Sequence, residues 1–170
     1  MKIILSLLTG LIMLTAAAVT LASDVGRPAP EILNETWLNS QPQHLTALKG
    51  RVVMVEFWTF GCYNCRNVEP YVKQWHKKFA PQGLVVIGVH SPEFDSERDI
   101  ENVKRYVQEH AITYPVAIDN DFATWKSYNN RYWPAMYLID KQGVIRYVHI
   151  GEGEYTTTEQ KIQALLAEGG

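Results

Sequence analysis

The chain has 170 residues, of which 46% are hydrophobic and 20% are charged, and its formal net charge is −2. A chain of this length forms one domain with a sizeable core and is short for two. The charges balance and no dense Lys/Arg cluster stands out, so we expect no nucleic-acid partner. No internal repeat or low-complexity tract is visible in the sequence.

Residues 1–22 have the layout of a secretory signal, with one positive charge at Lys2, an apolar stretch from Ile3, and small residues up to Ala22. The alternative is an uncleaved N-terminal membrane anchor, because the stretch approaches the roughly 20 apolar residues that cross a bilayer. Ser, Thr and Gly within it favour cleavage. We expect a signal peptide (or anchor) over 1–22 and one domain over 23–170. The domain is expected to be periplasmic or otherwise extracytoplasmic, touching a membrane only through an uncleaved N-terminal segment.

The elements expected after this segment alternate between strands and helices. Residues 23–50 are rich in proline and polar side chains, and predict a linker with one or two short strands or a hairpin. Residues 51–58 and 83–90 are almost continuously apolar, as in strands buried on both faces, and a helix between them ends near Phe79. The rest predicts a helix with Ile100, Val103 and Val107 on one face, a strand over 113–119, a short helix over 122–130, a hairpin of 135–140 and 144–150, and a helix from about Thr156.

This order predicts an α/β domain with a central mixed β-sheet flanked by helices. The first two buried strands are joined through a helix, so they should lie parallel. Their carboxyl ends then meet at one edge of the sheet, which is where α/β domains place their sites. Cys62 follows one of these strands, and residues 90–95 follow the other.

The only two cysteines, Cys62 and Cys65, lie three positions apart directly after the first apolar run. In the first turn of the following helix, the unpaired N–H groups would stabilise the Cys62 thiolate, and Cys65 could then attack a mixed disulfide. A structural bridge would close a very short loop and stabilise the fold little. A zinc site needs about four ligands, and the five histidines are scattered. The pattern therefore favours a redox-active pair without a metal.

Several segments resemble the thioredoxin-like superfamily, in particular its exported TlpA-type thiol:disulfide oxidoreductases. They include "EFWTFGCYNC" and "WPAMYLIDKQGVIRYVHIGEGEY", and the resemblance runs from about Pro28 to Leu166. "GVHSPEFD" and "ITYPVAIDNDFATWKSYNNRYWPA" are closer still to the thioredoxin-like domain of DipZ-type membrane electron carriers. The resemblance implies a thioredoxin-like fold, Cys62 and Cys65 as catalytic residues, and no cofactor beyond their redox-active disulfide. It also implies disulfide-bearing protein substrates and a membrane thiol carrier as electron donor. Most TlpA-type proteins are reductases, so we expect the reduction of other proteins' disulfides.

The resemblance also assigns residues around the cysteine pair. Glu56 stands where thioredoxins carry a buried acid, and a carboxyl group inside an apolar strand could take the proton from Cys65. The alternative is a Glu at the edge, in contact with water. Pro134 would be a cis-proline and, with Trp133, would pair with the substrate backbone, whereas a trans proline and a Trp133 packed in the core are the alternatives. The predicted substrate surface consists of Pro134, Trp133, Tyr63, Asn64 and Trp58.

Three other functions stay open. Tyr63–Asn64 is neither the Gly-Pro of thioredoxin nor the Pro-His of strong oxidants, so a thiol oxidant is one of them. A thiol peroxidase is the second, because Thr59 lies three residues before Cys62, although Cys65 favours disulfide exchange. A copper-binding chaperone is the third, with His149 as its one loose candidate ligand.

Two further expectations concern residues near the pair. His90 and Glu93 could line the active-site edge, but a solvated loop is the favoured interpretation. Relatives specialised in haem maturation often carry a Glu three positions after the second cysteine, where this chain has Val68, and Glu69 is one position off. That difference argues against such a specialisation.

Overall fold

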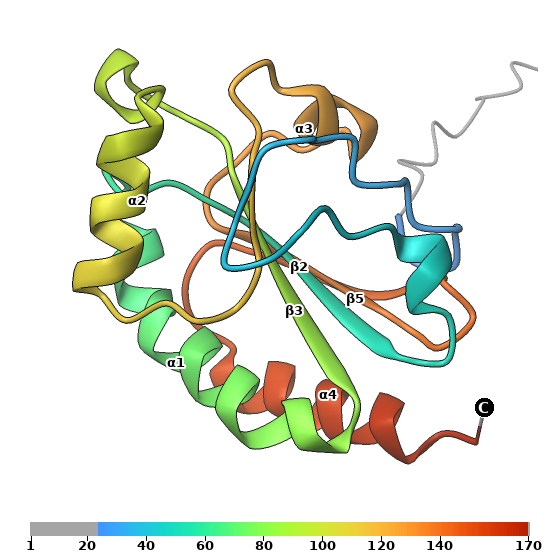
Figure 1. Cartoon of the computed structure of the whole chain (residues 1–170). Helices are drawn as coiled ribbons and strands as arrows, with labels where there is room; N and C mark the ends of the chain where they lie inside the picture. Colours follow the sequence, from blue (N-terminus) through green and yellow to red (C-terminus); the bar gives the residue numbers. More distant parts are fainter. Residues whose placement is uncertain (1–23, 170) are drawn as a thin grey trace, which may run out of the picture.

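A six-stranded mixed sheet, in the order β1-β4-β3-β2-β5-β6, forms the centre of the computed structural model, which describes residues 24–169 (Figure 1). The strands are β1 (Trp37–Leu38), β2 (Val52–Trp58), β3 (Leu84–His90), β4 (Val116–Ile118), β5 (Ala135–Ile139) and β6 (Ile145–Ile150). The helices are α1 (Tyr63–Phe79), α2 (Ile100–Glu109), α3 (Ala123–Ser127) and α4 (Tyr155–Ala167), with short 3₁₀ turns η1 (Leu45–Leu48), η2 (Ala80–Gln82) and η3 (Asp95–Glu97). The predicted signal or anchor over 1–22 lies outside the described residues. Within residues 24–169, no helix is long and apolar enough to cross a membrane.

The pairing of the strands brings two loops to one edge of the sheet. β2 runs parallel to β3, and β3 runs parallel to β4, whereas β5 is antiparallel to both β2 and β6. The mixed sheet, the parallel first pair and the β5–β6 hairpin are therefore confirmed. The chain leaves the end of β2 toward Cys62 and the end of β3 toward residues 91–97, so these two loops are neighbours.

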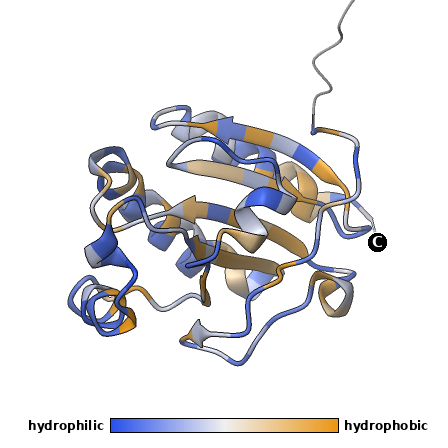
Figure 2. Cartoon of the chain, turned by 90° about the horizontal axis from the view of Figure 1, so that it is seen from above, coloured by the Kyte–Doolittle hydropathy of each residue, from blue (hydrophilic) through white to orange (hydrophobic). Residues whose placement is uncertain are grey.

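β2 is buried on both faces, because its residues alternate between two hydrophobic cores. Met54 and Trp58 face a core built with α1, α2 and α4, whereas Val55 and Phe57 face a core built with α3, η1 and the N-terminal segment. The central strands carry mostly hydrophobic residues in Figure 2. The continuous apolar run of residues 51–58 follows from this double burial.

The N-terminal segment differs from the hairpin that was one of its two predicted forms. Among residues 24–50 the structure has one two-residue strand, β1, which pairs antiparallel with β4 at the edge of the sheet. Polar contacts hold the segment in place: Asn34 Nδ2 donates to Asp119 Oδ1 at 2.8 Å, and Leu33 N donates to Thr124 Oγ1 at 2.9 Å. These partners lie far away in the sequence, which is why local pattern did not reveal them.

Candidate active site

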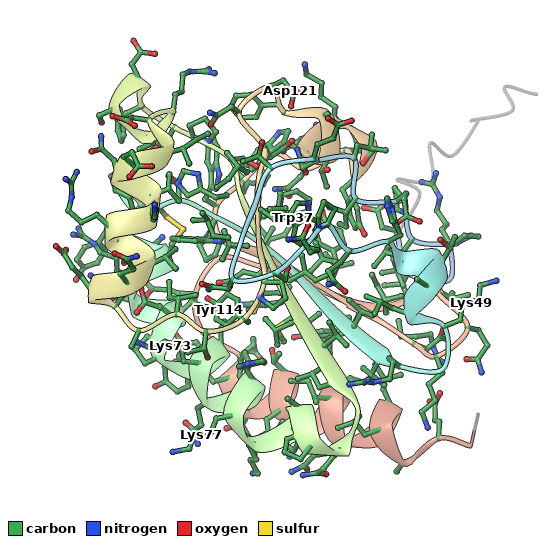
Figure 3. All side chains as sticks on the ribbon, viewed as in Figure 1. Trp37, Lys49, Lys73, Lys77, Tyr114 and Asp121 are labelled. Atoms are coloured by element: carbon green, nitrogen blue, oxygen red, sulfur yellow. A yellow bond between two sulfur atoms is a disulfide. The ribbon has the colours of Figure 1, made fainter. Side chains whose placement is uncertain are left out.

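The two cysteines meet at the N-terminus of α1. Cys62 is the N-cap residue, and its Sγ accepts a hydrogen bond from Cys65 N at 3.2 Å. A disulfide joins the pair, with the Cα atoms 5.3 Å apart (Figure 3, yellow). The first-turn N–H groups and the helix dipole favour negative charge at this position. The first cysteine of the pair therefore occupies the electropositive end of α1.

The side chains of the pair are both largely buried in this oxidised state. Cys62 is 9% exposed and Cys65 is 4% exposed, so the first cysteine is only slightly more accessible than the second. Tyr63, by contrast, is 69% exposed, and Asn64 is exposed as well. A partner that approaches the disulfide therefore meets these two side chains.

Glu56 lies inside the sheet, and its residue is 2% exposed. The alternative of a water-exposed Glu is thus excluded. Burial, followed by repulsion from Glu69, raises the pKa of Glu56 from 4.5 to about 8, although a hydrogen bond with Tyr114 lowers it. Its Oε2 atom has no hydrogen-bond partner among the described residues. Glu56 is consequently a mostly protonated acid near neutral pH, with a pKa in the range of a thiol.

Trp58 and Tyr114 pack beside Glu56 because the neighbouring strand position is a glycine. Gly88 pairs with Glu56, and a Cβ atom added there would lie 2.7 Å from Trp58 Nε1 and 3.1 Å from Tyr114 Cε2. Trp58 is 4% exposed and lies edge-on to His90, with ring centroids 5.1 Å apart. Unlike the exposed side chains of Tyr63 and Asn64, Trp58 supports the site from within the core.

The Trp133–Pro134 peptide bond is cis, as the resemblance implied. Ala135 pairs with Phe57 in the antiparallel β2–β5 ladder. Pro134, one residue before Ala135, therefore lies at the end of β2 that leads to Cys62. Trp133 is half-buried, and its indole Nε1 donates to Ser91 O at 3.0 Å. The Trp133–Pro134 segment and the turn that carries Cys62 thus begin at the same edge of the sheet.

His90 is fully buried, so its predicted place in a solvated loop is wrong, whereas Glu93 is exposed as expected. β3 continues through His90, whose Nε2 lies 3.2 Å from Thr59 Oγ1. Burial lowers the pKa of His90 to about 4, so it is neutral near pH 7. The hydroxyl of Thr59 is buried in this contact. The surroundings of Thr59 therefore give no support to the thiol peroxidase that the Thr-x-x-Cys spacing left open.

Two buried carboxylates near the site were not singled out as functional by the sequence. Glu97 is 1% exposed and lies in η3, after β3, within a charged stretch that is typical of a protein surface. Glu69 in α1 is 8% exposed and accepts hydrogen bonds from Lys73 Nζ at 3.0 Å and Tyr106 OH at 2.8 Å. The spacing of four residues between Glu69 and Lys73 was the one feature of the sequence that indicated such a contact. Glu69 thereby connects α1 to α2 and acts electrostatically on Glu56.

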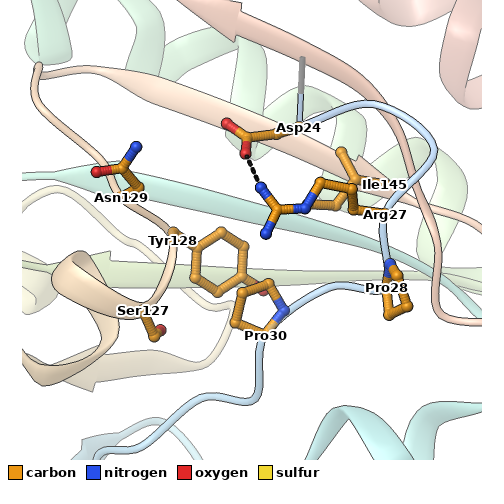
Figure 4. A pocket seen from close by; sticks show the side chains of 8 residues that line it. All are labelled: Asp24, Arg27, Pro28, Pro30, Ser127, Tyr128, Asn129 and Ile145. Atoms are coloured by element: carbon orange, nitrogen blue, oxygen red, sulfur yellow. Dashed lines mark hydrogen bonds and ion pairs between the residues drawn. The ribbon is translucent and has the colours of Figure 1, made fainter. Parts of the chain in front are cut away.

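Two other features of the described residues could mark a site: a group of metal ligands and a pocket. Within residues 24–169, no group of three or more His, Cys, Asp or Glu side chains is placed to hold a metal ion. His149 lies on β6, opposite Met136. The small pocket in Figure 4 has a volume of about 60 Å³, well below that of typical ligand sites. It is lined by Asp24, Arg27, Pro28, Pro30, Ser127, Tyr128, Asn129 and Ile145, none of which is a predicted site residue.

Several known proteins are similar to this chain in sequence and fold. The AhpC/TSA family matches residues 25–148. DipZ of Mycobacterium tuberculosis is 44% identical over 142 residues, which are 81% of this chain and 20% of DipZ, so the chain spans about a fifth of that relative. The thiol-disulfide oxidoreductase YkuV of Bacillus subtilis is 31% identical over 143 residues, which are 84% of this chain and 96% of YkuV. A crystal structure of a thioredoxin-like superfamily protein superposes with a TM-score of 0.78 at 27% identity, covering 84% of this chain and 98% of that one.

These matches confirm the resemblance to DipZ and the thioredoxin-like fold that the sequence predicted. The YkuV match extends over nearly the full length of that oxidoreductase and includes the region of the Cys62–Cys65 pair. The chain therefore belongs to the AhpC/TSA family of thioredoxin-like proteins and, within it, to the thiol-disulfide oxidoreductases.

Proposed function

We propose that this oxidoreductase is exported and reduces disulfides of other extracytoplasmic proteins through Cys62 and Cys65. In the reduced enzyme, the Cys62 thiolate attacks one sulfur of a substrate disulfide, and the other substrate sulfur leaves as a thiolate. The Cys65 thiolate then attacks Cys62 Sγ and releases the second substrate thiol. Two electrons thus pass to the substrate, and the enzyme is left with its own disulfide. The pair needs no other cofactor.

In this scheme the ionised form of Glu56, a minor form near neutral pH, takes the proton from Cys65. Its pKa of about 8 lies close to that of an ordinary thiol, so a proton passes between the two groups at little cost. The observation that carries the proposal is this combination: a cysteine pair at the N-terminus of α1 and a buried carboxyl group on the strand that leads into it.

The substrate is a disulfide-bearing polypeptide that meets the exposed side chains of Tyr63 and Asn64. Trp133 and Pro134 present its backbone to Cys62, and Trp58 supports this surface from below. The position of Pro134 at the end of β2 that leads to Cys62 supports this assignment.

The direction of electron flow is tested by equilibration with glutathione. We expect a reduction potential nearer that of thioredoxin, about −270 mV, than that of DsbA, about −120 mV. The reduced enzyme should reduce a protein disulfide, and the Cys62→Ser variant should not. A potential near that of DsbA would instead support the thiol oxidant. Rapid peroxide consumption or stoichiometric Cu(I) capture that depends on His149 would support one of the other two functions.

Export and the electron donor are tested in cells. The full chain should be recovered outside the cytoplasm, shortened to begin near Ser23, and a variant without residues 2–22 should stay inside. Export without shortening would indicate the membrane anchor. The resemblance to a domain of DipZ-type membrane electron carriers supports a membrane thiol carrier as donor. Loss of such a carrier should leave Cys62 and Cys65 oxidised in the cell.

A further inference from the structure

Glu97 ties the loop after β3 to the turn that precedes Cys62. Its carboxylate accepts three backbone hydrogen bonds, from Gly61 N at 2.7 Å, Glu93 N at 2.6 Å and Phe94 N at 2.9 Å. Its residue is 1% exposed. Every one of these partners is a donor, which is the arrangement that stabilises an ionised carboxylate.

The turn before Cys62 is shaped to receive this carboxylate. A Cβ atom added at Gly61 would overlap Glu97 Oε1, so a larger residue there would displace the carboxylate. Gly61 is bonded directly to Cys62, so the bond to Gly61 N holds the charge one residue from the nucleophile. Because the carboxylate and Cys62 are both largely buried, solvent and salt screen their interaction only weakly.

We propose that Glu97 is a positioning residue that fixes the turn before Cys62 and whose negative charge disfavours the Cys62 thiolate. The charge opposes the helix dipole of α1, which favours the thiolate. A less stable thiolate makes the reduced pair less stable relative to the disulfide, and this makes the pair a stronger reductant. The inference rests on the proposed role of Cys62 as the nucleophile, and it accounts for the reducing direction.

The other titratable groups near the Cys62 turn, among residues 24–169, are neutral, solvated or paired with other partners. Glu56 on β2 is mostly protonated near neutral pH, and His90 at the end of β3 is neutral because burial lowers its pKa to about 4. Arg66 on α1 is exposed, and its charge is solvated. Glu152, after β6, accepts a hydrogen bond from Asn67 on the surface. Glu69 on α1 is buried as well, but Lys73 and Tyr106 donate hydrogen bonds to it. Glu97 is the buried carboxylate that accepts a hydrogen bond from the turn before Cys62.

The test compares Glu97→Gln with Glu93→Gln in the reduced protein. Both changes remove one negative charge from the same loop, but Glu93 is exposed and its carboxylate lies in solvent. The pKa of Cys62 is read from the pH dependence of its alkylation. Glu97→Gln should lower this pKa by about one unit, whereas Glu93→Gln should leave it near that of the wild type. In Glu97→Gln, the equilibrium with glutathione should shift about tenfold toward the reduced protein, which corresponds to a reduction potential about 30 mV higher.

Two further variants separate charge from shape. Glu97→Asp keeps the charge and should retain the wild-type pKa of Cys62 more closely than Glu97→Gln does. Gly61→Ala keeps Glu97 but displaces its carboxylate, so it should lower the pKa as Glu97→Gln does, and it serves as the test if Glu97→Gln does not fold. A Cys62 pKa equal in Glu97→Gln and Glu93→Gln, or unchanged in folded Gly61→Ala, would overturn the inference. Failure of Cys62 to react with a disulfide in the wild type would instead overturn the proposed function.

Discussion

Glu56 is the side chain on which proton transfer in the proposed mechanism depends. It is buried, and its Oε2 atom lacks a hydrogen-bond partner among residues 24–169. Glutamine has the same shape but cannot take a proton from Cys65. The Glu56→Gln variant should therefore fold normally and reduce a substrate disulfide roughly ten- to a hundredfold more slowly near neutral pH. Stopped-flow measurement of dithiol–disulfide exchange checks this, with circular dichroism as the control for folding. Unchanged rates would remove Glu56 from the mechanism.

The same residue makes the stability of the protein depend on pH. In the unfolded chain Glu56 ionises near 4.5, whereas in the folded protein burial raises its pKa to about 8. Between these values the folded state holds one more proton, so its stability falls as the pH rises through this window. Glu56→Gln removes this loss. Relative to wild type, the variant should gain on the order of 4 kcal/mol between about pH 5 and about pH 9. Urea unfolding of the oxidised proteins measures the difference, and equal pH slopes would contradict it.

Residues differ in how far their roles could be predicted from sequence. Cys62 and Cys65 are neighbours along the chain, so their spacing alone pointed to the chemistry. The burial of Glu56 was predicted because its apolar neighbours in the chain are also its neighbours in the strand. Glu97 and His90 could not be recognised this way, since what buries them is the packing of the β3 loop against the turn before Cys62. Charged composition predicts a surface unless the three-dimensional partners are known.

Elements were predictable where they are long or strongly apolar. β2, β3 and the β5–β6 hairpin follow from apolar runs and from the Gly143 turn. β1 has two residues, and η1 is a single 3₁₀ turn, too short for any period to be detected. Tertiary contacts create both elements. The two cores on either face of β2 are likewise products of the whole chain.

At this scale, the junction between α1 and α2 depends on Glu69. Its carboxylate forms hydrogen bonds with Tyr106 and His110 of the α2 region and with Lys73. Its charge also raises the pKa of Glu56. Glu69→Gln should destabilise the protein by about 1–3 kcal/mol, because a buried network loses an acceptor, and should lower the pKa of Glu56. Chemical denaturation measures the first effect, and the pH dependence of exchange measures the second.

A matched control for Glu69→Gln is available on α2. Glu101 is exposed and pairs with Lys104 at 3.7 Å, so Glu101→Gln should change the free energy of unfolding by less than about 0.5 kcal/mol. If the two variants behave alike, Glu69 does not hold α1 and α2 together. If Glu69→Gln is less stable but exchange keeps its pH dependence, then Glu69 acts on packing alone.

For the whole molecule, the redox state and the folding equilibrium are linked. The disulfide closes a loop of only a few residues, so its crosslink adds little to stability by itself. The oxidised and reduced proteins differ instead in how far the folded structure stabilises the disulfide or the two thiols. A fold that disfavours the reduced pair, as Glu97 is proposed to do, has a low reduction potential and must unfold more easily once it is reduced. A strong oxidant shows the opposite order, because its reduced form is the stabilised one.

The order of the two melting temperatures therefore reports the direction of electron flow without any substrate. We expect the oxidised protein to melt above the reduced protein, by roughly 2–4 °C for each 1 kcal/mol of difference. Scans with and without a phosphine reductant measure this, and the Cys62→Ser/Cys65→Ser variant should melt at one temperature under both conditions. A higher melting temperature for the reduced protein would contradict the reductase assignment. Glu97→Gln should reduce the difference between the two melting temperatures, because it stabilises the reduced protein. Glu93→Gln should leave this difference unchanged.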